Sequence, residues 1–174
     1  MQLQILKPKQ SLNKAFLKEK LSRYAIDLFK KNFSVFLKNT SSNQGDEEHL
    51  KSQLAYFLRD TWYKDNHHIN PVGKNDLVIH TGKSTADPVG VIVEVKSINN
   101  RAEMISSLKP NVKAFHELVL YYLRQKIEEN NNGIKFLLAS NIDEWYLFDA
   151  NEFDKKIYRN SAVKKLYELK KSDN

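Results

Sequence analysis

The pattern of hydrophobic and polar residues divides this chain into helical and strand-like segments. Over residues 11–38, large apolar residues recur at helical spacing with Lys and Arg between them, which predicts one long amphipathic helix. The polar break NTSSNQGD follows, and Asp46 is well placed to cap the helix after it. That second helix is predicted over residues 47–63.

The middle of the chain changes to strand-like segments. Residues 75–80 and 90–96 alternate in the manner of strands and are joined by the turn-rich TGKSTADPV, while KDNHHINPVGK before them is a loop or an irregular first strand. A helix is predicted over residues 110–129, after which Gly133 can relax the chain. IKFLLASN and EWYLFDA follow as two strands, and a basic helix begins near Ser161.

These elements occur in the order α-α-β-β-α-β-β-α, which predicts a mixed α/β fold. A length of 174 residues favours one domain, and such a chain is long enough to bury a hydrophobic core. Within residues 1–174 we expect a basic N-terminal helix over 11–38, a central core over 46–150 and a basic C-terminal helix over 155–174.

Composition and charge narrow the class of protein. The chain has no Cys and no apolar run of membrane-spanning length, so we expect a cytoplasmic protein with no signal peptide and no membrane partner. The net charge of +7 is uneven: residues 1–38 carry +7, residues 39–154 carry −5 and residues 155–174 carry +5. Basic ends favour a polyanion such as nucleic acid, although solvated Lys-rich helices give the same signal.

Three ionisable residues stand inside the two apolar strands. Glu94 and Lys96 share one strand face, because alternate side chains of a strand point the same way, whereas Val91, Val93 and Val95 face the core. If the strands pair as a hairpin, Asp76 can lie across from Glu94. Two neighbouring carboxylates repel each other unless a cation joins them, which predicts a divalent metal beside Lys96. A structural Glu94–Lys96 pair is the competing interpretation.

The helix that precedes the strands can supply a further carboxylate. Glu47 falls on the helix face that carries Leu50 and Leu54, whereas Glu48 lies about 100° away. We therefore predict Glu47 at or beside the metal, with Glu48 as the alternative. A helix N-terminus also favours acidic residues through its dipole, without any site.

These residues resemble a known enzyme family. Glu47, then Asn75-Asp76, then VEVK ending at Lys96 resembles the PD-(D/E)xK nuclease superfamily, with Asn75 where the superfamily has Pro. Over residues 11–160, further blocks are similar to the N-terminal endonuclease region of type IIG restriction–modification enzymes: EEHLKSQLAYFLRDTWY, NDLVIH, GVIVEVKS, AFHELVLYYLR and SNIDEWYLFDA.

The resemblance implies a restriction-endonuclease-like mixed sheet flanked by helices, with a long N-terminal helix. It implies that Asp76, Glu94 and the carbonyl of Val95 bind Mg²⁺, for which Mn²⁺ can substitute, and that Lys96 is the catalytic base or a charge stabiliser. The implied partners are double-stranded DNA and the methyltransferase and target-recognition regions of a larger parent chain. The sequence has no methyltransferase motif, and cutting both strands is compatible with a transient dimer.

Several other residues carry weaker signals. His67 and His68 are interpreted as loop residues, because neighbouring His side chains of an extended chain point apart. Glu117, with Tyr121 four residues later, can order the edge of an active site, but a polar helix flank is the favoured interpretation. Trp62 and Trp145 are expected to fill the core.

Three alternatives to a type IIG nuclease domain stay open at this point. The N-terminal nuclease of a type I restriction motor subunit carries the same Asp and Glu-x-Lys. A non-cleaving DNA-binding or assembly module could keep the fold without activity. A purely structural α/β domain would leave the grouping of three acids and one Lys unexplained.

Overall fold

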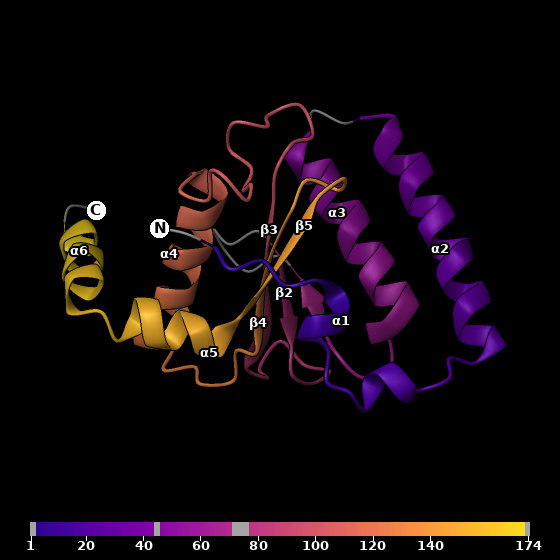
Figure 1. Ribbon diagram of the computed structural model, residues 1–174, viewed down its shortest axis with the longest axis horizontal. Coiled ribbons are helices and arrows are strands. Elements are labelled where there is room, and N and C mark those ends of the chain that lie inside the picture. The colour runs from indigo at the N-terminus through magenta and orange to yellow at the C-terminus, as the bar shows by residue number, and fades with distance from the viewer. Residues whose placement is uncertain (1–2, 44–45, 71–76, 173–174) are drawn as a thin grey trace.

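A five-stranded mixed sheet forms the centre of the protein (Figure 1). The structure is a computed structural model that describes residues 3–43, 46–70 and 77–172. The strands follow the order of the sequence: β1 (Ile69–Asn70), β2 (Leu77–His80), β3 (Val89–Val95), β4 (Phe136–Ser140) and β5 (Trp145–Asp149). Among the described strands, only the β3–β4 pair is parallel, since a helical crossover joins these two strands. The mixed α/β class expected from the sequence is confirmed.

The sheet is covered by helices on both faces (Figure 1). On one face α3 (Glu47–Leu58) packs against the strands, with α2 (Arg23–Ser41) outside it. On the other face lies α4 (Lys113–Ile127), followed towards the C-terminus by α5 (Ala150–Phe153) and α6 (Ser161–Ser172). Two buried apolar clusters result, one on each face of the sheet.

The β2–β3 hairpin predicted from the sequence is present. The two strands are antiparallel, Leu77 pairs with Val93, and the register shifts at Ile79 and His80. Val93 and Val95 belong to the cluster beneath α3, as their alternation with Glu94 predicted. The strand pattern therefore fixes which residues of β3 face each helical layer.

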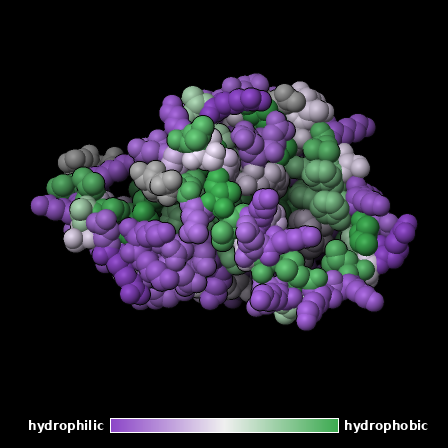
Figure 2. Space-filling model, viewed as in Figure 1, coloured by the Kyte–Doolittle hydropathy of each residue, from purple (hydrophilic) through white to green (hydrophobic). Residues whose placement is uncertain are grey.

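The single long helix predicted over residues 11–38 is wrong. The segment instead contains the short helix α1 (Pro8–Ser11), a 3₁₀ turn at Phe16–Lys18 and then α2, which begins at Arg23. Ser22 caps α2 by accepting a hydrogen bond from the amide of Ala25 at 3.1 Å. Three of the apolar residues that suggested a helix are exposed: Phe16, Leu21 and Tyr24. Figure 2 shows that hydrophobic side chains also reach the surface elsewhere on the face in view, as green atoms among the purple ones.

Other boundaries need smaller corrections. The predicted cap Asp46 is confirmed, since its side chain accepts a hydrogen bond from the amide of His49, but the α-helix ends at Leu58 and a π-helical turn covers Arg59–Tyr63. After α4, the residue with positive φ is Asn130 (48°), so the chain turns before Gly133. A second π-helical turn, Asp154–Tyr158, precedes the predicted last helix.

The two tryptophans do not fill the core, contrary to the expectation. Trp62 packs its ring against Phe29 and Phe57 and leaves more than half of its surface exposed. Trp145 is also exposed, and its indole N–H donates a hydrogen bond to the carbonyl of Ile142 at 2.7 Å. Within the described ranges, no helix is both long enough and apolar enough to cross a membrane.

Candidate active site

Lys96 lies at the centre of an ionic cluster at the end of β3. Its Nζ is 2.5 Å from Glu94 Oε1, 2.6 Å from Glu117 Oε2 and 3.7 Å from Glu47 Oε2. The Lys96 side chain is 3% exposed and that of Glu94 is fully buried, whereas Glu117 and Glu47 are partly exposed. We call these four residues the carboxylate–lysine cluster.

The cluster draws on three elements from both sides of the sheet. Glu94 comes from β3, Glu117 from the second turn of α4, and Glu47 from the first residue of α3. Lys96 follows β3 directly, and its amide donates to the carbonyl of Ser140 on β4 at 2.9 Å. Acidic residues from the helices on both faces of the sheet therefore contact the side chain of Lys96, at the end of the central strand.

Glu47 is fixed by the backbone as well as by charge. Its Oε1 accepts a hydrogen bond from the amide of Ser97 at 3.2 Å, which links the start of α3 to the residue after Lys96. Glu48 points elsewhere: it pairs with Lys51 at 2.5 Å and its side chain is largely exposed. Of the two acids proposed from the sequence, the structure brings only Glu47 to Lys96.

The charges and hydrogen bonds within the cluster determine the protonation states of Lys96 and Glu117. Burial alone would lower the pKa of Lys96, but the charges of Glu94 and Glu117 outweigh burial and hold that pKa above its ordinary value of 10.5. Burial would likewise raise the pKa of Glu117, but hydrogen bonding to Glu94 and Lys96 outweighs it and lowers that pKa below 4.5. Lys96 is therefore an ammonium and Glu117 a carboxylate at neutral pH.

Acids outnumber bases in the cluster. Three carboxyl groups surround one ammonium, which leaves a formal charge of −1 when Glu94 carries the proton of its hydrogen bond to Glu117 and −2 when all three are ionised. A further base on α4, Lys113, forms its own ion pair with Glu103 at 3.0 Å, and that bond lowers the pKa of Glu103. The arrangement favours a cation at its open side, because like charges in a poorly hydrated place repel strongly.

The other residues proposed from the sequence fall in different places. Asp76 lies outside the described residues, although Leu77, the next residue in the chain, pairs with Val93. Val95 is the last residue of β3 and its side chain is buried. In the described part of the chain, no three His, Asp or Glu residues form a group that could hold a metal ion. His67 and His68 precede β1 and contact His80, the last residue of β2.

Sequence reasoning underrated Glu117. The pattern favours a polar helix flank, yet Glu117 Oε2 lies 2.6 Å from Lys96 Nζ, almost as close as Glu94 Oε1 at 2.5 Å. The signal was present: Ala114, Leu118 and Tyr121 are all buried, and Glu117 lies among them at helical spacing. An acid inside a buried helix stripe indicates a partner, which here is Lys96.

Comparison with known proteins assigns the chain to a family. One family model matches residues 6–174, nearly the whole chain. The chain belongs to that family, a domain of unknown function (DUF7149). No curated protein and no solved structure matches it. Because the description of DUF7149 specifies no activity, the resemblance to restriction nucleases stays a prediction.

Proposed function

We propose that this DUF7149 domain is a metal-dependent endonuclease domain that hydrolyses phosphodiester bonds in double-stranded DNA. The observation that carries the proposal is the buried Glu94–Lys96 pair at the end of β3, with Glu47 and Glu117 added from the two helical layers. The finer fold that we propose is restriction-endonuclease-like, and the mixed five-stranded sheet with a helix on each face supports it.

A purely structural ion pair accounts poorly for this cluster. Burying two charges is costly, and replacing a buried pair with apolar residues is often neutral or stabilising. A structural ion pair needs only one carboxylate, whereas the Lys96 Nζ has oxygens of three Glu side chains within 3.7 Å. A surplus of acid at the end of two parallel strands is more typical of a site that receives a cation and an anionic substrate.

The donor set fits a hard divalent cation. Mg²⁺ prefers carboxylate and carbonyl oxygens, and Mn²⁺ accepts the same ligands. Asp76, Glu94 and the carbonyl of Val95 would hold the ion, with Glu47 at its side. When bound, such an ion polarises a phosphate and lowers the pKa of a coordinated water.

Lys96 is suited to stabilising charge rather than removing a proton. The adjacent carboxylates raise its pKa, so that it stays an ammonium at neutral pH. An ammonium can donate hydrogen bonds to a phosphate oxygen or orient the attacking water. Glu117, 2.6 Å away, holds the Lys96 Nζ in place and opposes its deprotonation.

The proposal extends to partners and to the parent protein. The basic N-terminal residues 1–38, with a charge of +7, can contact phosphates without reading the bases. Sequence recognition would then come from methyltransferase and target-recognition regions of a larger chain of the type IIG kind. An isolated domain can be silent in cleavage for that reason, so the first test should measure metal binding.

That test is a calorimetric titration of Mn²⁺ and Mg²⁺ into the purified domain. We expect binding that Asp76→Asn and Glu94→Gln abolish, that Glu47→Gln weakens, and that Glu48→Gln leaves unchanged. Glu48→Gln is a matched control, because it alters the neighbouring acid, which pairs with Lys51. If the unsubstituted domain binds no metal even with DNA present, the non-cleaving DNA-binding module replaces the nuclease.

A further inference from the structure

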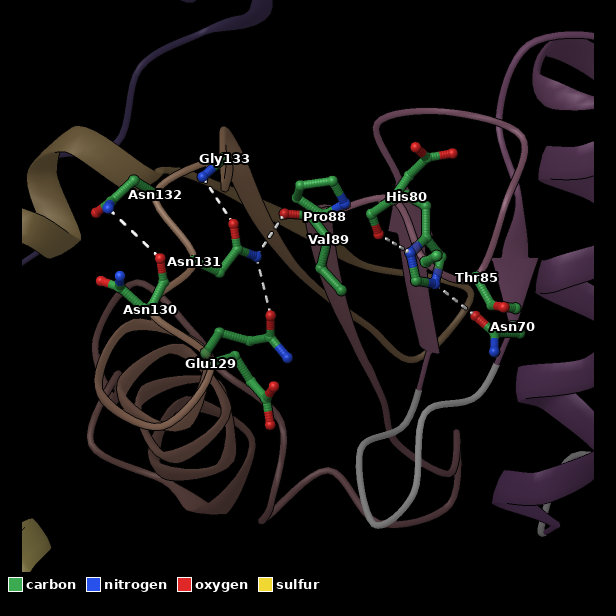
Figure 3. Close-up of a pocket in the computed structure, with 13 residues that line it drawn as sticks. Asn70, His80, Thr85, Pro88, Val89, Glu129, Asn130, Asn131, Asn132 and Gly133 are labelled. Carbon is green, nitrogen blue, oxygen red and sulfur yellow. Dashed lines mark hydrogen bonds between the residues drawn. The ribbon is translucent and has the colours of Figure 1, made fainter.

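The cavity beside His80 is lined by polar groups that bond to one another (Figure 3). Asn131 donates to the carbonyl of Val89 at 2.9 Å. The two ring nitrogens of His80 lie 2.6 Å from the carbonyl oxygen of Asp87 and 2.9 Å from Asn70 Oδ1. These bonds join neighbouring strands and loops, so the fold itself explains the polar lining. Surfaces that the fold leaves uncovered lie instead near the N-terminus and along β5.

The N-terminal segment, residues 4–21, is exposed along its whole length. Figure 1 shows it running from the side of α4 across the molecule, through α1 and towards α2. Soluble proteins rarely leave many large apolar side chains of one region open to water. Six of them are between 46% and 70% exposed here: Ile5, Leu6, Leu12, Phe16, Leu17 and Leu21. Their number indicates that another surface covers this segment.

A second uncovered apolar surface lies on the outer part of the sheet. β5 is the last strand in the order, so its outer edge has no strand neighbour among the described residues. Leu147 pairs with Leu138 and Trp145 with Ser140, so these side chains lie on one face of the sheet, together with Phe136. Leu138 packs against the apolar cluster beneath α3, but Phe136, Trp145 and Leu147 are 45%, 40% and 64% exposed. We call these three side chains and the outer edge of β5 the β5 face.

The two surfaces carry opposite charges. The N-terminal segment has five Lys and one Glu, which gives a charge of +4. Residues 136–149 have three exposed acids, Asp143, Glu144 and Asp149, and no Lys or Arg, which gives a charge of −3. Two β5 faces would therefore repel each other, whereas a basic segment with apolar side chains complements this face.

A second copy of the chain is the partner that covers both surfaces. Within one chain the N-terminal segment leaves its own apolar side chains and those of the β5 face exposed. DNA would contact the Lys residues through its phosphates but would leave the apolar side chains uncovered. A reciprocal exchange between two copies involves residues 4–21 and the β5 face of each protomer, which is close to the roughly 20–30 residues a side of a standard interface.

We propose that the N-terminal segment of each chain docks on the β5 face of a second copy, so that two reciprocal contacts form a two-fold dimer. The apolar side chains of the segment pack against Trp145 and Leu147, and its Lys residues lie near Asp143 and Glu144. The edge of β5 adds backbone hydrogen bonds to the segment. This dimer goes beyond the proposed nuclease and does not depend on it, and α2 keeps its own Lys residues for phosphates.

The test is sedimentation velocity of the whole chain, without DNA or metal, at about 1–100 μM, a range that includes the dissociation constants of weak specific contacts. Asp143→Lys/Glu144→Lys reverses the charge of the β5 face, and Lys14→Glu/Lys18→Glu reverses that of the segment. All four positions are exposed, and an unchanged Tm by circular dichroism shows that a variant keeps its fold. We expect the unsubstituted chain to dimerise and each double variant to dimerise at least about tenfold more weakly.

Mixing the two double variants distinguishes contact between chains from contact within one chain. An equimolar mixture should recover the dimer, because each segment then meets a β5 face of opposite charge. Lys31→Glu/Lys38→Glu is the matched control, since it makes the same change of charge at exposed positions of α2 and should dimerise like the unsubstituted chain.

Three results would overturn the proposal. They are a chain that stays monomeric at about 100 μM, a mixture that stays monomeric, and a control that loses the dimer as fully as Lys14→Glu/Lys18→Glu. If the unsubstituted chain is monomeric and Lys14→Glu/Lys18→Glu binds a DNA duplex more weakly than the control, the segment is a nucleic-acid contact instead. Loss of metal binding at Glu94 would leave the dimer unchanged, so the two proposals fail separately.

Discussion

Replacing Lys96 with Met should test how strongly the carboxylate–lysine cluster depends on its single ammonium. Met has a similar length and no charge, so that the fully buried Glu94 would lose the ammonium 2.5 Å away. Removing one partner of a buried ion pair typically costs about 3–5 kcal/mol. The upper part of this range applies, because Glu117 at 2.6 Å loses the same partner.

The size of this effect makes it easy to measure. A loss of about 3–5 kcal/mol is a large part of the total stability of an ordinary domain, about 5–15 kcal/mol. For a chain of 174 residues it corresponds to a fall in Tm of roughly 6–20 °C. Urea unfolding at pH 7, followed by circular dichroism, gives the free energy of unfolding for each variant.

Two controls separate charge burial from loss of a side chain. Lys155→Met breaks a surface pair with Glu152 at 3.1 Å, and it should cost about 1 kcal/mol or less because both partners are exposed. The double variant Glu94→Gln/Lys96→Met removes both charges and should recover part of the loss. If Lys96→Met lowers the free energy of unfolding no more than Lys155→Met does, the Lys96 ammonium does not stabilise the buried carboxyl groups, and the electrostatic reasoning fails.

Three further predictions follow from local structure. The pKa of Glu117 is lowered in the folded protein, so its ion pair stabilises the domain above pH 4.5 and is lost as the pH falls through the folded-state pKa. Glu117→Gln should therefore make the free energy of unfolding depend less on pH below about pH 5. Urea unfolding at several pH values measures this dependence. Ser22→Ala removes the cap of α2 and should cost about 1 kcal/mol by the same assay, whereas no change would show that α2 does not need this cap. Asn130 has φ of 48°, so Asn130→Ala should lower Tm by a few degrees and Asn130→Gly should not; equal effects would contradict the backbone explanation.

The sequence predicts best where a pattern is local. The alternation around Glu94 correctly predicts that Val93 and Val95 face the core, and the antiparallel pairing with residues 77–80 is present as expected. Asp46 was recognised as a cap because capping depends on residues three positions apart. In each case neighbours in the chain supply the physical constraint, so no knowledge of the distant packing was required.

The errors arise where apolar residues are not buried. Phe16, Leu21 and Tyr24 suggested a continuous helix, but they lie on the surface and Ser22 starts α2 later. Periodicity indicates a helix only when a core covers the apolar face, and here none does. Glu117 was underrated for a related reason, since its contact with Lys96 depends on how α4 packs against the end of β3.

The position of the cluster in the fold connects its charge to its proposed chemistry. Lys96 follows the carboxyl end of β3, which pairs in parallel with β4, and in open α/β sheets ligands bind at such ends. Helices reach this point from both faces, and each contributes an acid rather than an apolar residue. A fold that needed only stability would fill this place with packed hydrocarbon, as it does along the rest of β3. The surplus of carboxyl groups around one ammonium therefore supports our proposal that a cation and a phosphate share this site.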